Sequence, residues 1–330
     1  MRKIVIRAPG GVEALELVDV PAPVPGPRDV VVEAAAIGVG WPDILIRRGT
    51  YKWMPTLPAS PGSDLAGHVV AVGAEVDTSM LGQPVLVTAR ELPQRGGCYA
   101  ERVCVPADAV FVLPPHLDVE AAVCLPNYQV AWNLVHEVER SRPLRSIFIN
   151  GVAGGVGSAV AQIAKSAGMT VYGSVSSEAK AAFAREQGVD HAIDRTRGSV
   201  VAEVMRLSQG AGVDIAVDHV GGPGFAALIG LLAPWGTLVS YNASGGLPEE
   251  NLLGELRRHG ARCPAIRIFE MHVYDNDREN RRRIMNSVIA AWAEGRIRPI
   301  VSKRYAMEDV RQAHALLEKG DAMGKVILEP

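Results

Sequence analysis

The stretch Asn150–Gly157 reads Asn-Gly-Val-Ala-Gly-Gly-Val-Gly and follows the apolar run Ser146–Ile149. The apolar run predicts a buried strand, and the apolar spacing after the glycines predicts a helix that ends on Gly168. In such a strand–turn–helix unit, glycines let the backbone approach a pyrophosphate, and the N–H groups at the helix start bind its charge. The stretch therefore predicts a dinucleotide site with contacts from Gly154, Gly155, Val156 and Gly157.

Val152 stands where the usual Gly-x-Gly-x-x-Gly fingerprint has its first glycine, so the motif alone also fits a flexible loop before an ordinary helix. The following residues favour the dinucleotide site, because strand and helix patterns alternate with short connections. Such alternation is typical of a doubly wound parallel sheet. The expected strands are 170–175, 192–194, 213–217 and 237–240, and the expected helices are 177–187, 199–207 and 224–232.

Composition excludes several classes of protein. The chain has 330 residues, 48% hydrophobic and 21% charged, which suits two packed domains. The net charge of −2 gives no sign of a nucleic-acid footprint, and no apolar run reaches the roughly 18 residues that span a bilayer. We expect a cytoplasmic protein with no nucleic-acid or membrane partner. The four cysteines, Cys98, Cys104, Cys124 and Cys263, match no zinc pattern and are expected to be buried free thiols.

The first part of the chain differs from the middle. Residues 1–118 carry many prolines and glycines, which suggest a small, strongly curved sheet. Its strand candidates are 30–32, 65–72 and 85–87; the end of the chain has helix patterns near 279–294 and 307–319 and a closing strand at 325–328. The order of helices and strands in that end segment does not continue the doubly wound sheet. We therefore expect 267–330 to complete the domain formed by 1–118, with 119–266 inserted as the cofactor domain.

Five stretches, taken together and in order, resemble a known family. They are Asp43–Tyr51, Pro61–Gly67, Gly96–Glu101, Asn150–Gly157 and Gly324–Val326. The chain resembles, over essentially its whole length, the zinc-independent quinone oxidoreductase branch of the medium-chain dehydrogenase/reductase superfamily, which includes zeta-crystallin-like proteins. The resemblance implies an α/β protein with a GroES-like, mostly-β catalytic domain and a Rossmann domain that binds NADP(H). It also implies a homodimer joined through the edges of the cofactor sheets.

The resemblance implies a metal-free reaction that reduces quinones or α,β-unsaturated carbonyl compounds with NADPH. Zinc-dependent relatives place a cysteine where this chain has Gly40, a His-Glu pair where it has Ser63-Asp64, and a third ligand near Pro126. Because Asp64 alone cannot hold zinc, we expect no metal site.

The end of the second expected strand favours NADP over NAD. An NAD-specific site has an acidic residue there, near Val175, that accepts a hydrogen bond from the ribose hydroxyl. This chain has no acidic residue at that strand end. Ser176 lies beside that point, and the resemblance places Lys180 and Arg195 where the family contacts the 2′-phosphate and the adenosine. Glu178 is a competing partner for Lys180. The nicotinamide half is expected, also from the resemblance, to contact Asn127, Val130, Tyr241, Asn242 and Phe269, with Val130 replacing the family's threonine.

Tyr51 is the candidate catalytic residue. It matches a tyrosine that related enoyl-thioester reductases use, and a phenol with a pKa of about 10 can donate a hydrogen bond to a developing enolate. Packing of Tyr51 on the nicotinamide ribose is an equally open interpretation. Asp43 is expected to cap or orient local backbone rather than to act as an acid.

Two other functions stay open. An enoyl-thioester reductase would need cations for a phosphopantetheine arm, for which Arg47, Arg48 and Lys52 are candidates or else solvated charges. The second open function is that of an NADPH-binding protein with little turnover. The presence of Val130 in place of the family's threonine favours this function. The substrate itself cannot be inferred, because loops that shape a pocket carry no transferable code.

Overall fold

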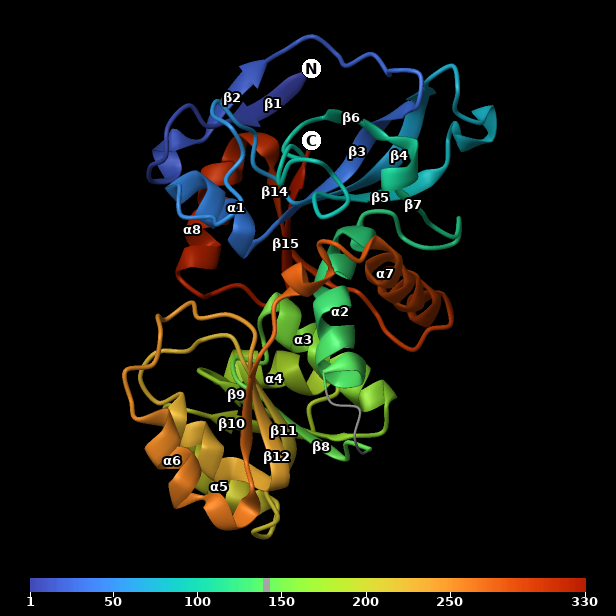
Figure 1. The fold of residues 1–330 in the computed structure, drawn as a ribbon. Coiled ribbons are helices and arrows are strands. Elements are labelled where there is room, and N and C mark those ends of the chain that lie inside the picture. The colour runs from blue at the N-terminus through green and yellow to red at the C-terminus, as the bar shows by residue number, and fades with distance from the viewer. Residues whose placement is uncertain (139–142) are drawn as a thin grey trace. The chain divides into compact units, whose positions relative to one another are not determined.

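A computed structural model describes residues 1–138 and 143–330 (Figure 1). The chain forms two compact units, one made of Met1–Pro126 with Pro299–Pro330 and the other of Asn127–Arg298. This division differs from the expected ranges at 119–126 and 267–298. Residues 267–298 belong to the second unit because α7 (Arg278–Ala293) is tied to α2 (Leu125–Trp132), where Gln129 Nε2 donates to the Arg281 carbonyl at 2.8 Å.

The second unit is built on a six-stranded sheet with the order β10-β9-β8-β11-β12-β13. Every neighbouring pair in it is parallel, which confirms the doubly wound sheet. Its strands are β8 (Ser146–Ile149), β9 (Thr170–Val175), β10 (His191–Asp194), β11 (Val213–Asp218), β12 (Leu232–Ser240) and β13 (Ala265–Ile268).

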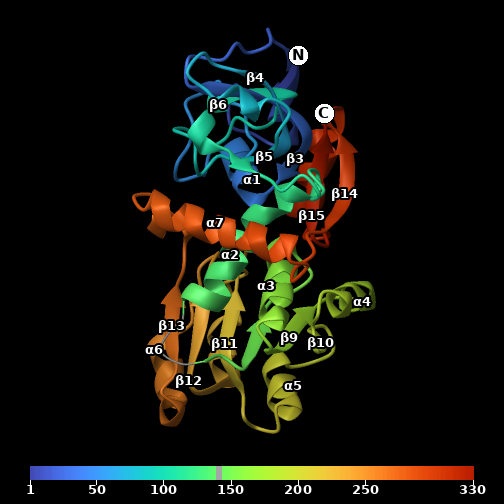
Figure 2. The same ribbon diagram turned by 90° about the vertical axis from the view of Figure 1, so that its right-hand side faces the viewer.

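Helices connect these strands, as Figure 2 shows from the side. They are α3 (Gly155–Ser166), α4 (Glu178–Glu186), α5 (Val200–Leu207) and α6 (Leu252–Arg258). Most follow the expected ranges. The prediction of an α-helix at 224–232 is wrong, because Ala226–Leu231 is a 3₁₀ helix and β12 already begins at Leu232. The edge strand β13 was not expected; it has four residues, too few for its pattern to stand out from the surrounding loop.

Large apolar side chains fill the core of the second unit. Phe148 of β8, Leu238 of β12 and Ile229 of the 3₁₀ helix are completely buried there. Burial of one such side chain contributes about 1.5–3 kcal/mol. The core therefore fixes the strands whose carboxyl ends form the edge described below.

The first unit holds a seven-stranded sheet with the path β14-β15-β3-β4-β5-β7, β6 pairing with β3. The closing strand lies inside this sheet, so the end of the chain does return to complete the first unit. The strands are β3 (Asp29–Val39), β4 (Asp64–Val72), β5 (Pro84–Thr88), β6 (Arg102–Pro106), β7 (Phe111–Val112), β14 (Val301–Ala306) and β15 (Lys325–Glu329); β1 (Arg2–Val5) and β2 (Glu16–Asp19) form a separate antiparallel pair.

Two helices pack in the first unit, α1 (Trp41–Arg48) and α8 (Val310–Glu318). Ile46 of α1, Val32 of β3 and Leu328 of β15 share one buried core. The expectation of buried thiols is wrong for Cys104 and Cys263, which are exposed, whereas Cys98 and Cys124 are buried. Cys98 precedes β6, so its even spacing from Cys104 places the two on no common strand face.

Candidate cofactor and active site

The glycine-rich turn runs from the end of β8 into α3. Gly154 precedes the helix, and the first N–H groups of α3, at Gly155, Val156 and Gly157, have no acceptor within the helix. A Cβ on Gly157 would lie 2.8 Å from the Gly151 oxygen and 2.9 Å from Val152 Cα, so only glycine lets helix and turn pack this closely. The turn thus has the shape and the donors of a pyrophosphate site.

Val152 fits the turn because of a second glycine in the neighbouring strand. Val152 is completely buried. A Cβ on Gly173 of β9 would lie 2.5 Å from Val152 Cγ1. The side chain that replaces the first fingerprint glycine therefore occupies space that β9 leaves open.

A chain of hydrogen bonds holds the turn to the carboxyl ends of three strands. Gly151 N donates to Ser174 Oγ at 2.9 Å, and Ser174 Oγ donates to Asn150 Oδ1 at 2.6 Å. Asn150 Nδ2 donates to Asp218 Oδ1 at 2.6 Å, and Gly221 N donates to Asp218 Oδ2 at 2.7 Å. Ser174 and Asp218 are buried. This network preorganises the turn before any ligand arrives.

The predicted cofactor residues of the second unit follow the strand order along this edge. Backbone N–H groups fix three of them: Arg195 N donates to Val175 O at 2.9 Å, Tyr241 N to Asp218 O at 2.9 Å and Phe269 N to Ser240 O at 2.9 Å. Tyr241 is half-buried, Asn242 is exposed and Phe269 is buried. The carboxyl edge of a doubly wound sheet is where such folds bind ligands.

The expected phosphate corner lies at the ends of β9 and β10. Lys180 Nζ is 3.4 Å from Ser176 Oγ, and Ser177 caps α4 by accepting from Lys180 N. Glu178 pairs with Arg185 at 2.8 Å. The corner therefore gathers a serine hydroxyl and a lysine, with exposed Arg195 directly after the adjoining strand β10.

Sequence reasoning missed an acid at this corner, because it considered only the end of β9. Asp194 lies opposite Val175 in the sheet. Its Oδ1 accepts from Thr196 N at 2.9 Å and Thr196 Oγ1 at 2.7 Å, and its Oδ2 is 3.1 Å from Arg197 Nε. These hydrogen bonds to Thr196 lower the pKa of Asp194. The carboxylate is thus held by its own loop.

Helix α2 presents Asn127 and Val130 on one face. Both are half-buried and stand three residues apart, which places them side by side on a helix. Tyr128 and Gln129 are buried; the Tyr128 hydroxyl donates to the Arg298 carbonyl at 3.1 Å. The packing of these neighbours fixes the orientation of the Asn127–Val130 face.

In the first unit, Tyr51 is half-buried against the core beyond the end of α1, with its ring centroid 5.7 Å from that of Trp53. The three candidate cations for a phosphopantetheine arm differ. Arg47 is buried and pairs with Glu318, Arg48 is 2.7 Å from the same carboxylate, and Lys52 lies over the Trp53 ring. Arg47 is therefore neither a solvated charge nor an exposed cation.

Asp64, one of the positions compared above with zinc ligands, belongs to a buried ion pair. Lys325 Nζ of β15 is 2.9 Å from Asp64 Oδ2, and both side chains are buried. A Cβ on Gly40 would lie 4.0 Å from that nitrogen. Burial lowers the pKa of Lys325, but the neighbouring Asp64 carboxylate raises this pKa by more than burial lowers it. The net shift is therefore upward. The ammonium group therefore stays charged.

Asp43 is hydrogen-bonded to Gly40, Gly62 and Ser63. These contacts confirm the expectation that it caps and orients local backbone. Its Oδ2 accepts from Gly40 N at 2.8 Å, and its Oδ1 accepts from Gly62 N at 3.1 Å and Ser63 Oγ at 2.8 Å. Burial, followed by the nearby Asp64 charge, raises the pKa of Asp43 to about 6. Within residues 1–138 and 143–330, no group of three His, Cys, Asp or Glu side chains is placed to hold a metal.

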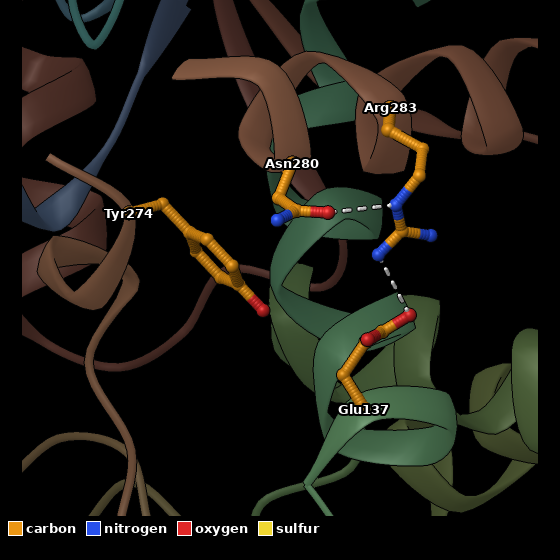
Figure 3. Close-up of a pocket in the computed structure, with 4 residues that line it drawn as sticks. All are labelled: Glu137, Tyr274, Asn280 and Arg283. Carbon is orange, nitrogen blue, oxygen red and sulfur yellow. Dashed lines mark hydrogen bonds and ion pairs between the residues drawn. The ribbon is translucent and has the colours of Figure 1, made fainter. Parts of the chain in front are cut away.

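A pocket of about 410 Å³ lies elsewhere in the second unit, lined by Glu137, Tyr274, Asn280 and Arg283 (Figure 3). Arg283 connects two of its walls, because Nη2 is 3.3 Å from Glu137 Oε1 and Nε is 3.1 Å from Asn280 Oδ1. None of the predicted site residues lines this pocket. No helix in the described part of the chain is long and apolar enough to cross a membrane.

Known families match both parts of the chain. The alcohol dehydrogenase GroES-like domain matches residues 26–115, and the zinc-binding dehydrogenase family matches residues 187–328. A quinone oxidoreductase of Pseudomonas aeruginosa is 32% identical and covers 100% of this chain and 99% of its own length. The synaptic vesicle membrane protein VAT-1 homolog of Rattus norvegicus is 31% identical and covers 100% of this chain and 84% of its own.

A solved structure repeats the fold. The quinone oxidoreductase of Escherichia coli, determined in complex with NADPH, has a TM-score of 0.88 and 27% sequence identity, and the match covers 100% of both chains.

Proposed function

The chain belongs to the quinone oxidoreductase branch of the medium-chain dehydrogenase/reductase superfamily, and from this membership we propose an NADPH-dependent, metal-free reductase of quinones or α,β-unsaturated carbonyl compounds. The observation that carries the proposal is the preorganised turn before α3, with Ser176 and Lys180 close together after the next strand, β9. The NADPH complex of the E. coli relative supports the choice of cofactor.

The second unit would hold the cofactor with its own groups. The first N–H groups of α3, at Gly155–Gly157, are donors for a pyrophosphate, and Ser176 with Lys180 supplies a hydroxyl and a cation for a 2′-phosphate. Arg195 adds a second cation near the adenosine. The nicotinamide half is proposed to be lined by Asn127, Val130, Tyr241, Asn242 and Phe269. Val130, Tyr241 and Phe269 supply the apolar and aromatic surface that such sites use, and the two asparagines supply polar groups.

The reaction leaves negative charge on the acceptor's carbonyl oxygen. NADPH supplies the hydride when it is bound. Tyr51 is proposed to donate a hydrogen bond to the developing enolate, since a phenol O–H is protonated at neutral pH. For a quinone, water can supply the protons and no residue need be essential.

The metal-free part of the proposal rests on Lys325. Its ammonium group pairs with Asp64 and lies close to Gly40, so a divalent cation there would meet a buried positive charge. We expect the purified protein to contain no stoichiometric zinc and to keep its activity in a chelator. Elemental analysis that finds about one tightly bound zinc per chain would refute this expectation.

The reaction itself is tested by NADPH oxidation with three acceptors: a quinone, an enone and a crotonyl thioester. Turnover of the quinone or the enone is expected, with the thioester reduced poorly because Arg47 and Arg48 both pair with Glu318. Preferred reduction of the thioester would favour an enoyl-thioester reductase. Tight NADPH binding without turnover of any acceptor would favour a binding protein.

From the same family membership we also propose a homodimer that works in the cytoplasm. Light scattering coupled to size exclusion tests the first part, and a monomer mass would contradict it. Cell fractionation tests the second, which recovery in the membrane fraction would contradict.

A further inference from the structure

The carboxyl edge of the second sheet has one strand without a proposed contact. β10, β9, β8, β12 and β13 each lead into a proposed cofactor residue, whereas β11, directly beside β8, does not. β11 ends at Asp218 and is followed by His219. In a doubly wound sheet, the gap between these two central strands is the position where ligands bind.

Asp218 is not available to a ligand. Asn150 Nδ2 and Gly221 N occupy its two oxygens at 2.6 and 2.7 Å, and the side chain is buried. The Asp218 carboxylate is thus already used to hold the turn.

His219 lies against the glycine-rich turn. A Cβ on Gly151 would be 2.5 Å from His219 Cε1 and 3.4 Å from Nε2, and the ring centroid is 5.8 Å from that of Tyr241. His219 Nδ1 is 3.1 Å from the Asn150 carbonyl oxygen. A carbonyl can only accept, so Nδ1 carries the hydrogen and Nε2 of the neutral ring is an acceptor. Nε2 makes no hydrogen bond with any residue that the structure describes.

We infer that His219 Nε2 accepts a hydrogen bond from a ribose hydroxyl of the bound dinucleotide. This inference rests on the proposed function. A ribose stands on each side of the pyrophosphate in a dinucleotide, so the strand beside the pyrophosphate turn meets a ribose. The half-buried ring, already held by Asn150, offers this acceptor at little cost in side-chain entropy.

Burial keeps His219 neutral. Burial lowers the pKa of the imidazole, and the Asp218 charge and the Asn150 carbonyl only partly offset it. Tyr241 is the other titratable group against the ring, and burial raises its pKa, so it adds no charge. Below the lowered pKa of His219, protonation of Nε2 removes the acceptor.

Calorimetric titration of the apoprotein with NADPH tests the inference. His219→Phe keeps a ring against Gly151 and should weaken NADPH binding by about three- to tenfold, the effect of one neutral hydrogen bond. His219→Gln keeps an acceptor near the Nε2 position and should bind nearly as the unaltered protein does. Equal binding by the Phe variant would overturn the inference alone, whereas no binding by the unaltered protein would overturn the proposed function.

Two further measurements separate the alternatives. The affinity ratio of the unaltered protein to His219→Gln should not rise as the pH is lowered; a rise would mean that protonated Nε2 donates to a phosphate, which overturns the inference. If His219→Phe does not fold, the ¹⁵N signal of His219 Nε2 in the unaltered protein still decides. It should shift on saturation with NADPH, and an unchanged signal overturns the inference.

The ribose is identified with 2′,5′-ADP, which carries the adenosine half alone. A penalty in His219→Phe for both ligands supports the inference with the adenosine ribose as donor. A penalty for NADPH alone supports it with the nicotinamide ribose as donor.

Discussion

In the first unit, the buried polar groups of Asp43, Asp64 and Lys325 use hydrogen bonds and charge within that unit, whereas the sheet edge of the second unit leaves groups unused. The first N–H groups of α3 and His219 Nε2 have hydrogen-bonding capacity that no residue in 1–138 or 143–330 fills. A closed cluster supports a fold, and an open row of donors and acceptors recognises a ligand. We therefore associate the polar residues of the closed cluster with stability and those of the open row with binding.

The closed cluster should give the largest effect. Lys325→Met leaves the Asp64 carboxylate buried without its cation, which should cost about 3–5 kcal/mol of stability. Thermal and urea unfolding measure the loss. Lys319→Met, at an exposed position, is the matched control and should change little. Equal melting of the two variants would mean that the ion pair does not support the first unit.

Tyr51→Phe tests whether a residue of the first unit takes part in the reaction. If the phenol donates to the enolate, kcat for an enone should fall by about 10²-fold, with NADPH binding barely changed and a smaller loss for a quinone. Steady-state kinetics on both acceptors measure this. Unaltered enone turnover would leave Tyr51 with a packing role only.

Lys180→Ala tests the open corner of the second unit. Loss of a charge-assisted contact should weaken NADPH binding by about tenfold or more and leave NADH binding nearly unchanged. Arg185→Ala removes a cation from the same helix that already pairs with Glu178, and it should leave both affinities alone. Equal or better NADH binding by the unaltered protein would contradict the preference for NADP.

Two glycines of the turn should separate folding from binding. Gly157→Ala forces a Cβ against backbone and should cost about 1–3 kcal/mol, whereas a Cβ on Gly154 meets only the Gly151 oxygen, at 3.5 Å. Thermal unfolding of both variants measures the difference. Loss of NADPH binding by a stable Gly154→Ala variant would assign that glycine to the ligand; equal destabilisation would contradict the close packing at Gly157.

Local patterns predicted much of the second unit. The turn, α3 and the strands β8, β9 and β11 follow from apolar spacing and glycine positions within short windows. β13 was missed because four residues give too short a pattern. Ala226–Leu231 was misjudged because its tight turns lead straight into β12.

Long-range partners could not be predicted in this way. Lys325 belongs to a stretch that helped to identify the family, but nothing local indicates that Asp64 is its partner. His219 lies in no recognised motif; only the strand order places it beside the turn. Val152 and Gly173 show the same limit, since their shared volume appears only when β9 lies beside the turn.

The position of β15 bears on the order in which the protein can be made. β15 lies between β14 and β3, and Lys325 follows its carboxylate partner by 261 residues. On a ribosome, the first unit therefore lacks its inner strand and the cation that pairs with Asp64 until β15 has been synthesised. The second unit is one continuous segment, Asn127–Arg298, and all six of its strands are present before β14 begins. Since domains fold as units during synthesis, the cofactor-binding half can be complete while the half that encloses it in the sequence is still open.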